Sequence, residues 1–109
     1  MKYFVKDKDR VGSCYYEYYK GKWDGKTFWR KDSILIHDDV LHNVEEYEDA
    51  IIKAIPEYDP WGETEVYPEQ WKAIGETIKD SRAVALYNEA DIWVRKTFEE
   101  YPCFTILGL

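Results

Sequence analysis

The sequence has few of the features that mark secreted or membrane proteins. It contains two cysteines among 109 residues, too few for the disulfide framework of a small secreted domain. No run of about eighteen apolar residues is present to span a bilayer, and the first residues lead into a strand-like pattern without the apolar segment of a signal peptide. We therefore expect a cytoplasmic protein in which Cys14 and Cys103 are buried thiols, with a bridge between them as the less favoured alternative.

Catalytic signatures are also missing. The chain has no glycine-rich phosphate loop and no G-x-S-x-G nucleophile elbow, and neither cysteine has a patterned histidine near it. His37, Asp38, Asp39, His42 and Glu45 are of metal-ligating types. However, Asp38, His42 and Glu45 would face solvent, where ligands have no supporting side chains. We therefore expect no enzyme activity, no cofactor and no metal ion.

The composition is that of a folded domain with an uneven charge. Hydrophobic residues make up 45% of the chain and aromatic residues 17%, which indicates a single domain over residues 1–109. The net charge is −7, but residues 1–37 carry nine Lys and Arg against five Asp and Glu, whereas residues 38–109 carry six against seventeen. This charge can serve solubility alone; the alternative is an acidic docking face for a basic protein. Direct binding of nucleic acid is disfavoured because carboxylates repel phosphates.

The N-terminal third predicts short antiparallel strands. Residues 2–6 alternate as a short edge strand. The aromatic segments 14–19 and 27–30 predict a hairpin, because the pair Asp24-Gly25 between them favours a tight turn. The apolar run 33–37 predicts a further short strand before the first helix.

Two later helices and a closing strand complete the pattern. One helix is expected to begin near Pro68, whose missing amide proton suits a first helical turn, and another to run for roughly twenty residues before Pro102. The apolar segment 103–107 predicts a strand inside the sheet. Together these elements indicate an α+β fold, with a small antiparallel sheet of N-terminal hairpins plus the C-terminal strand and about three helices on one face.

The stretch from Asp38 to Glu69 combines an amphipathic helix with an acidic loop. It holds eleven carboxylates and one lysine. Apolar side chains recur at helical spacing up to Pro56, so one face of this helix is apolar and the carboxylates fall largely elsewhere. Asp38 or Asp39 is expected to cap the helix, and Pro56 to end it.

The loop after this helix sets a tryptophan among acids. Pro60 and Gly62 mark a turn around Trp61. Tryptophan is among the residues most enriched at interface hot spots, although a ring that folds back over the core is the alternative. Clustered carboxylates would steer a basic partner to this surface. The candidate partner-binding residues are Glu45, Glu46, Asp49, Glu57, Tyr58, Asp59, Trp61, Glu63 and Glu65.

These features resemble those of a known class of proteins. The small acidic domain, with Tyr58-Asp59-Pro60-Trp61-Gly62-Glu63 between helices and a closing Phe104-Thr105-Ile106-Leu107-Gly108 strand, looks like the immunity proteins that bacteria encode beside polymorphic or contact-dependent toxins. The resemblance implies a cognate inhibitor with no reaction of its own. Such a protein covers the active site of a basic toxin, in many cases a nuclease.

Two other classes stay open. An aromatic pocket between the hairpin and the helices, built from Tyr16, Tyr18, Trp29 and Trp93, would make the chain a small-molecule or peptide-binding module or a small enzyme. Two parallel rows of carboxylates would instead mark an acidic DNA mimic that blocks nucleic-acid-binding proteins. A deep cavity would favour the first of these, whereas a flat acidic face with an exposed Trp61 favours the inhibitor.

Overall fold

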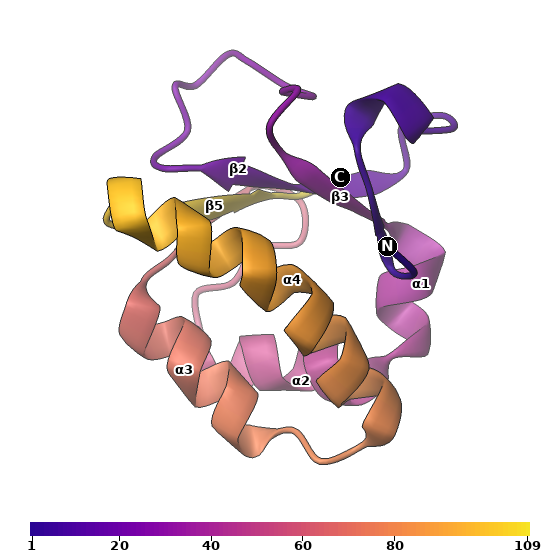
Figure 1. The fold of residues 1–109 in the computed structure, drawn as a ribbon, viewed down its shortest axis with the longest axis vertical. Helices are drawn as coiled ribbons and strands as arrows, with labels where there is room; N and C mark the ends of the chain where they lie inside the picture. The colour runs from indigo at the N-terminus through magenta and orange to yellow at the C-terminus, as the bar shows by residue number, and fades with distance from the viewer.

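The fold is built on an antiparallel sheet that carries all the α-helices on one face (Figure 1). A computed structural model describes residues 1–109. The sheet has five strands in the order β1-β3-β2-β5-β4, and each pair of neighbours is antiparallel. The strands are β1 (Phe4–Val5), β2 (Tyr15–Lys20), β3 (Ile34–His37), β4 (Glu63–Val66) and β5 (Phe104–Leu107).

The helices confirm the predicted α+β class but number four rather than three. They are α1 (Asp38–Asn43), α2 (Glu45–Ala54), α3 (Pro68–Thr77) and α4 (Ser81–Glu100), and a short 3-10 helix, η1 (Asp7–Asp9), follows β1. The first predicted helix is interrupted because Val44 leaves helical geometry, at φ −113° and ψ 67°. The predicted cap is also wrong: the Asp39 amide donates to Nδ1 of His37 at 3.0 Å, so the imidazole caps α1.

The predicted hairpin between segments 14–19 and 27–30 is wrong in its second strand. Strand β2 pairs instead with β3, where Tyr18 lies opposite Ile34. Two local features keep the intervening segment out of the sheet. The Asp24 carboxylate accepts the amides of Lys26 and Thr27 in a local turn, and Trp29 has a φ of 60°, a left-handed conformation that lies outside the β region of a regular strand.

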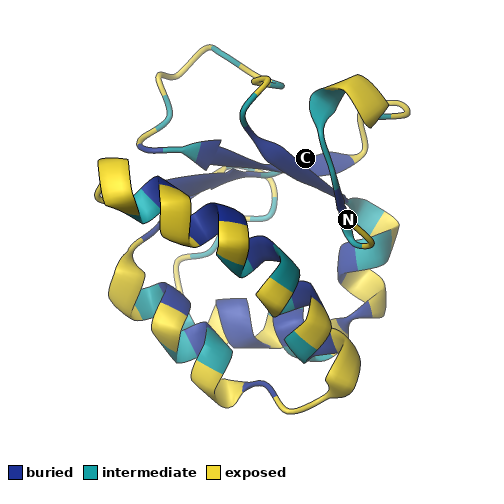
Figure 2. Ribbon diagram, in the orientation of Figure 1, coloured by how far each residue is buried: buried dark blue, intermediate teal, exposed yellow.

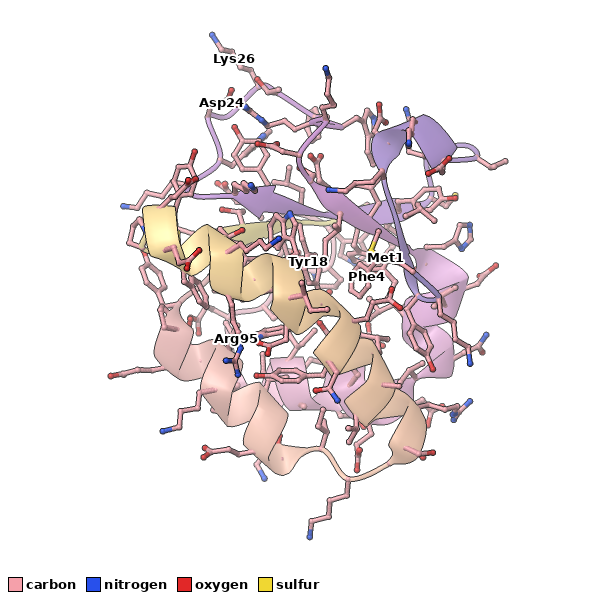
Figure 3. All side chains as sticks on the ribbon, viewed as in Figure 1. Met1, Phe4, Tyr18, Asp24, Lys26 and Arg95 are labelled. Atoms are coloured by element: carbon pink, nitrogen blue, oxygen red, sulfur yellow. The ribbon has the colours of Figure 1, made fainter.

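Both faces of β2 are buried, for different reasons. Tyr16 and Tyr18 point toward the helices and belong to a cluster of 22 buried residues between sheet and helices. Figure 3 shows Phe4 and Tyr18 in this layer, whereas Asp24 and Lys26 stand at the tip of the loop above the sheet. Glu17 faces the other way, yet it is 1% exposed, because the loop of residues 21–33 covers that side of the strand (Figure 2).

Strand β4 was not predicted, whereas the expected position of β5 is confirmed. Strand β5 lies between β2 and β4, as its apolar residues on both faces predict. Strand β4 occupies the segment interpreted as part of the acidic loop, because its two glutamates hide the alternation with the buried Thr64 and Val66. At the opposite edge, β1 is shorter than the predicted strand of residues 2–6.

The two cysteines differ in their surroundings. Cys103 is buried and Cys14 is exposed, and neither forms a disulfide. The expectation that Cys14 is buried is therefore wrong, because its side chain lies ahead of β2 in an exposed connection. No α-helix of the structure combines the length and the apolar character that crossing a bilayer requires.

Candidate functional site

The turn around Trp61 presents a large aromatic ring to solvent. The Trp61 side chain is 75% exposed, so the alternative in which it covers the core is excluded. The turn is held by its own hydrogen bonds: the Trp61 amide donates to Oδ1 of Asp59 at 2.9 Å, and the Asp59 amide donates to Oγ1 of Thr64 at 3.0 Å. The ring is therefore displayed from an ordered turn.

The end of β5 fastens the same turn from the other side. The amide of Gly108 donates to the Gly62 carbonyl at 2.7 Å, and that of Leu109 to the Pro60 carbonyl at 3.0 Å. A Cβ on Gly108 would lie 2.2 Å from the Pro60 carbonyl oxygen. Only glycine permits this close approach of the two backbones.

An acidic groove runs along β4 beside this turn. It has a volume of about 320 Å³ and is lined by Glu57, Glu63, Thr64, Glu65, Tyr67 and Gln70. The Tyr67 hydroxyl donates to Oε1 of Glu65 at 2.9 Å. This hydrogen bond, together with partial desolvation, raises the pKa of Tyr67 to about 12. We refer to Glu57, Asp59, Trp61, Glu63 and Glu65 as the Trp61 site.

The carboxylates of the Trp61 site have no cationic partner within the chain. The ion pairs of the structure join other residues, and none of them involves Glu57, Asp59, Glu63 or Glu65. Glu57, Asp59 and Glu63 are exposed, and Glu65 is half-buried. Their negative charges are therefore available to an external cation.

Tyr58 has a different place from the one expected of an interface residue. It is half-buried and packs against the core, and its hydroxyl oxygen is buried without a hydrogen-bond partner. Burial, with the nearby Tyr18 second, raises the pKa of Tyr58 above its ordinary value. Tyr58 thus supports the turn from within, while Trp61 stands outside.

The acidic residues of α2 do not join the Trp61 site. The Trp61 site follows the C-terminal end of α2, whereas Glu45 is its first residue. A helix of ten residues spans about 15 Å, so Glu45 lies at the end of α2 away from that site. Glu45 and Asp49 are exposed. The Glu46 carboxylate, in contrast, accepts the amides of Lys79 and Asp80, both at 2.8 Å, and ties α2 to the turn between α3 and α4.

His42 contacts Asp38, one of the carboxylates considered with it in the sequence, but its second partner is Glu48 and not Glu45. Its Nε2 lies 2.7 Å from Oδ1 of Asp38, and its Nδ1 lies 3.0 Å from Oε1 of Glu48. The hydrogen bond to Glu48 is the main cause that raises the pKa of His42 above its ordinary value. Glu45 is not part of this network, and no three His, Cys, Asp or Glu side chains are arranged to hold a metal ion.

The aromatic pocket proposed from the sequence does not form. Tyr16, Tyr18 and Trp93 are at most 8% exposed and fill the core, while the Trp29 backbone binds Glu17 on the opposite face of the sheet. These four residues therefore line no common cavity.

A different groove lies between α3 and α4. It has a volume of about 420 Å³, and sequence reasoning missed it. The rings of Trp71 and Tyr87 stack there with centroids 4.4 Å apart. Asp91 accepts hydrogen bonds from Trp71 Nε1 at 2.8 Å and from Arg95 Nε at 2.7 Å, and Figure 3 shows Arg95 on the side of α4 that faces α3. Asp91 and Arg95 are four residues apart on α4, and this i,i+4 spacing of opposite charges is the one sequence signal that could have pointed to the surface.

No family model, curated protein or solved structure matches the chain.

Proposed function

We propose that this protein binds a basic protein partner through the Trp61 site. The observation that carries the proposal is the 75% exposure of Trp61 on a turn whose backbone is fixed by hydrogen bonds. These bonds come from side chains of the turn and β4 and from the backbone at the end of β5. An aromatic ring on a preorganised turn binds with a small loss of conformational freedom, and tryptophan is the kind of residue that dominates interface energies.

The unpaired carboxylates supply the second element of recognition. Because no cation of the chain neutralises Glu57, Asp59 or Glu63, their field extends into solvent and accelerates encounter with a positively charged surface. The ring then provides the contact area that charge alone lacks. This division of roles supports a partner that is basic and carries an apolar recess for the indole.

Within this class we propose an immunity protein. The resemblance of the chain to bacterial immunity proteins supports a cognate toxin as the partner, in particular a basic nuclease whose active site the Trp61 site covers. The proposal requires no reaction by this protein. It requires affinity high enough to neutralise the toxin in the cell that makes both proteins.

The test has two steps: the genes beside this one are searched for a toxin domain, and that domain is then paired with this protein. We expect co-expression to restore growth of a host that makes the toxin domain, and we expect Trp61→Ala to weaken binding by about 30-fold, equivalent to about 2 kcal/mol. The matched control is Ile92→Ala, which removes an apolar side chain that is also largely exposed, at 67%, but lies on α4. Equal affinities of the wild type and Trp61→Ala for a toxin that this protein neutralises would move the interface elsewhere.

A second candidate function rests on the groove between α3 and α4. The half-buried ring of Tyr87, which is backed by the buried Trp71, and the exposed Arg95 are suited to a small planar ligand with a negative group. A ligand screen followed by thermal shift measurements tests this function. The expected sign is a stabilisation by the ligand that Arg95→Ala removes and Trp61→Ala leaves unchanged.

A further inference from the structure

The two edges of the sheet differ in how many of their backbone hydrogen-bonding groups are occupied. At the β1 edge, the carboxylate of Glu89 on α4 accepts the backbone amides of Lys2, Tyr3 and Phe4 at 2.7, 2.9 and 2.7 Å. These donors are therefore occupied, and the strand they lead into is two residues long. That edge offers little backbone to another chain.

The β4 edge has free backbone groups. Just before β4, the Gly62 carbonyl accepts the Gly108 amide, so these two residues form a hydrogen-bonded pair between the β4 and β5 segments. On the opposite side of β5, the Gly21 amide donates to the Cys103 carbonyl, so the backbone of Cys103 faces β2 instead. Hydrogen bonds of an antiparallel pair recur at every second residue. Counting by twos from the Gly62–Gly108 pair along the register, the N–H and C=O groups of Thr64 and Val66 point toward β5. Those of Glu63 and Glu65 therefore point away from β5, out of the sheet.

The outward groups of β4 have no partner in the chain. No side chain and no loop backbone forms a hydrogen bond with the N–H or C=O groups of Glu63 and Glu65. Both residues line the acidic groove of about 320 Å³. An ordered strand with free donors and acceptors, open to a groove, is the arrangement to which an extended segment of another protein adds as a new strand.

We propose that the partner binds by adding an extended basic segment to β4 as a sixth strand of the sheet. The basic character of the segment rests on the proposed function, and the groove supports it independently through Glu57, Glu63 and Glu65. Lysine or arginine at alternate positions of the segment would lie on the same face as Glu63 and Glu65, since side chains of a strand alternate. Trp61, two residues before Glu63, would cover one end of the added strand.

Charge also identifies which occupant the edge disfavours. A second copy of this chain, pairing β4 with β4, would bring the glutamates of one strand against those of the other. Like charges opposite each other destabilise a strand pair, and charged residues on an edge are a common protection against self-association. The same two glutamates thus discourage dimerisation and favour a basic segment.

The probe for this proposal is a synthetic peptide, Lys-Thr-Lys-Val-Lys-Thr, with the peptide in which glutamate replaces lysine as its control. We expect the basic peptide to bind, to slow amide hydrogen exchange at Glu63 and Glu65, and to leave the amide exchange of Phe4 unchanged. The acidic peptide should bind at least tenfold more weakly. Binding of the basic peptide without slower exchange at Glu63 and Glu65 would overturn the proposal.

Proline variants separate strand addition from charge. Glu65→Pro and Glu63→Pro each remove an amide that points out of the sheet, and prolines are tolerated at such edge positions. We expect either variant to weaken peptide and toxin binding at least tenfold, whereas Glu65→Gln, which keeps the amide, should weaken binding less and in a salt-dependent way. A denaturant melt identifies a proline variant that fails to fold. If both proline variants fail to fold, the amide exchange of Glu63 and Glu65 in the wild-type protein with the basic peptide decides whether a strand is added.

The outcomes distinguish this proposal from the proposed function. If Trp61→Ala abolishes toxin binding while both folded proline variants bind within twofold of wild type, the partner site stands and strand addition is overturned. If the proline variants lose binding while Trp61→Ala does not, strand addition stands and the anchor is wrong.

Discussion

The hydroxyl of Ser33 donates to Oε2 of Glu17 at 2.6 Å, and both residues are almost fully buried. The same carboxylate accepts the amides of Trp29 and Arg30 at 2.7 and 3.0 Å. Glu17 therefore holds the loop of residues 21–33 on the sheet without any cation beside it. A buried carboxylate in this position is tolerated because its hydrogen bonds replace those it would make with water.

Removing the Glu17 carboxylate should destabilise the fold more than removing one of its donors. We expect Glu17→Ala to lower the free energy of unfolding by about 3 kcal/mol, because it leaves a cavity and two amides without partners. Ser33→Ala should cost about 1 kcal/mol, since one hydrogen bond is lost and the carboxylate keeps the other two. Urea melts of the two variants test the order, and equal losses would contradict it.

His42 should make stability depend on pH near neutrality. Its carboxylate neighbours raise its pKa in the folded state above the ordinary value of 6.5. The folded state therefore holds the proton more tightly than the unfolded state does, so the stabilisation is fully present below about pH 6.5 and is lost as the pH rises through the raised pKa. Unfolding free energies from pH 6 to 8 should fall in wild type relative to His42→Gln. Parallel profiles of the two proteins would exclude this role.

Truncation to alanine should leave the free energy of unfolding nearly unchanged at Trp61 and lower it strongly at Trp93. Trp61→Ala should leave the free energy of unfolding within about 0.5 kcal/mol of wild type, as changes at exposed positions usually do. Trp93→Ala should lose about 3 to 5 kcal/mol, because Trp93 fills the core and its Nε1 donates to the Asp32 carbonyl at 2.8 Å. Denaturant melts of both variants measure the difference. A large loss for Trp61→Ala would show that the ring supports the fold.

The adjacent residues Glu45 and Glu46 of α2 should differ in how much they contribute to the free energy of unfolding. Glu46→Ala should destabilise the protein by about 1 kcal/mol, because it removes the acceptor shared by the amides of Lys79 and Asp80. Glu45→Ala should change stability by less than about 0.5 kcal/mol, since the Glu45 carboxylate is exposed and forms no ion pair. The pair is internally controlled because the two residues are adjacent. Similar melts for both variants would refute the assigned role of Glu46.

Association with the toxin domain should slow when the free carboxylates are neutralised. We expect Glu57→Gln with Glu63→Gln to lower the association rate constant several-fold at low salt, with little effect on dissociation. Glu45→Gln with Asp49→Asn removes the same charge farther from Trp61 and should have a smaller effect. Stopped-flow measurements at two salt concentrations test this prediction. Unchanged association rates at low salt would contradict electrostatic steering.

The sequence was most informative where a local pattern and burial agreed. The strand at Phe104–Leu107 and the helix that ends before Pro102 follow from apolar periodicity and proline, and both are present. The hairpin prediction is wrong in its second strand: Asp24 does form a local turn, but the strand that pairs with β2 is β3 and not residues 27–30. Strand β2 pairs with the apolar run of β3, and the buried Glu17 binds the loop between them; no local sequence pattern marks either relation.

The candidate site shows a similar division. The exposed Trp61 and the acids beside it lie in one segment, so local reasoning could bring them together. The role of Glu46 depends on amides more than thirty residues away, and the free edge of β4 depends on the order of strands in the sheet. Such long-range relations, like the break at Val44, arise from tertiary packing that overrides local propensity.

The exposure of Trp61 has a practical consequence for following the interaction. Of the five tryptophans, Trp71 and Trp93 are buried, Trp23 and Trp29 are partly covered, and Trp61 alone is mostly surrounded by water. Its indole fluorescence should therefore lie at longer wavelengths than that of the buried rings and be the most easily quenched by acrylamide. A partner that covers the ring would shift this emission to shorter wavelengths and protect it from quenching, so the native protein carries its own optical reporter of binding.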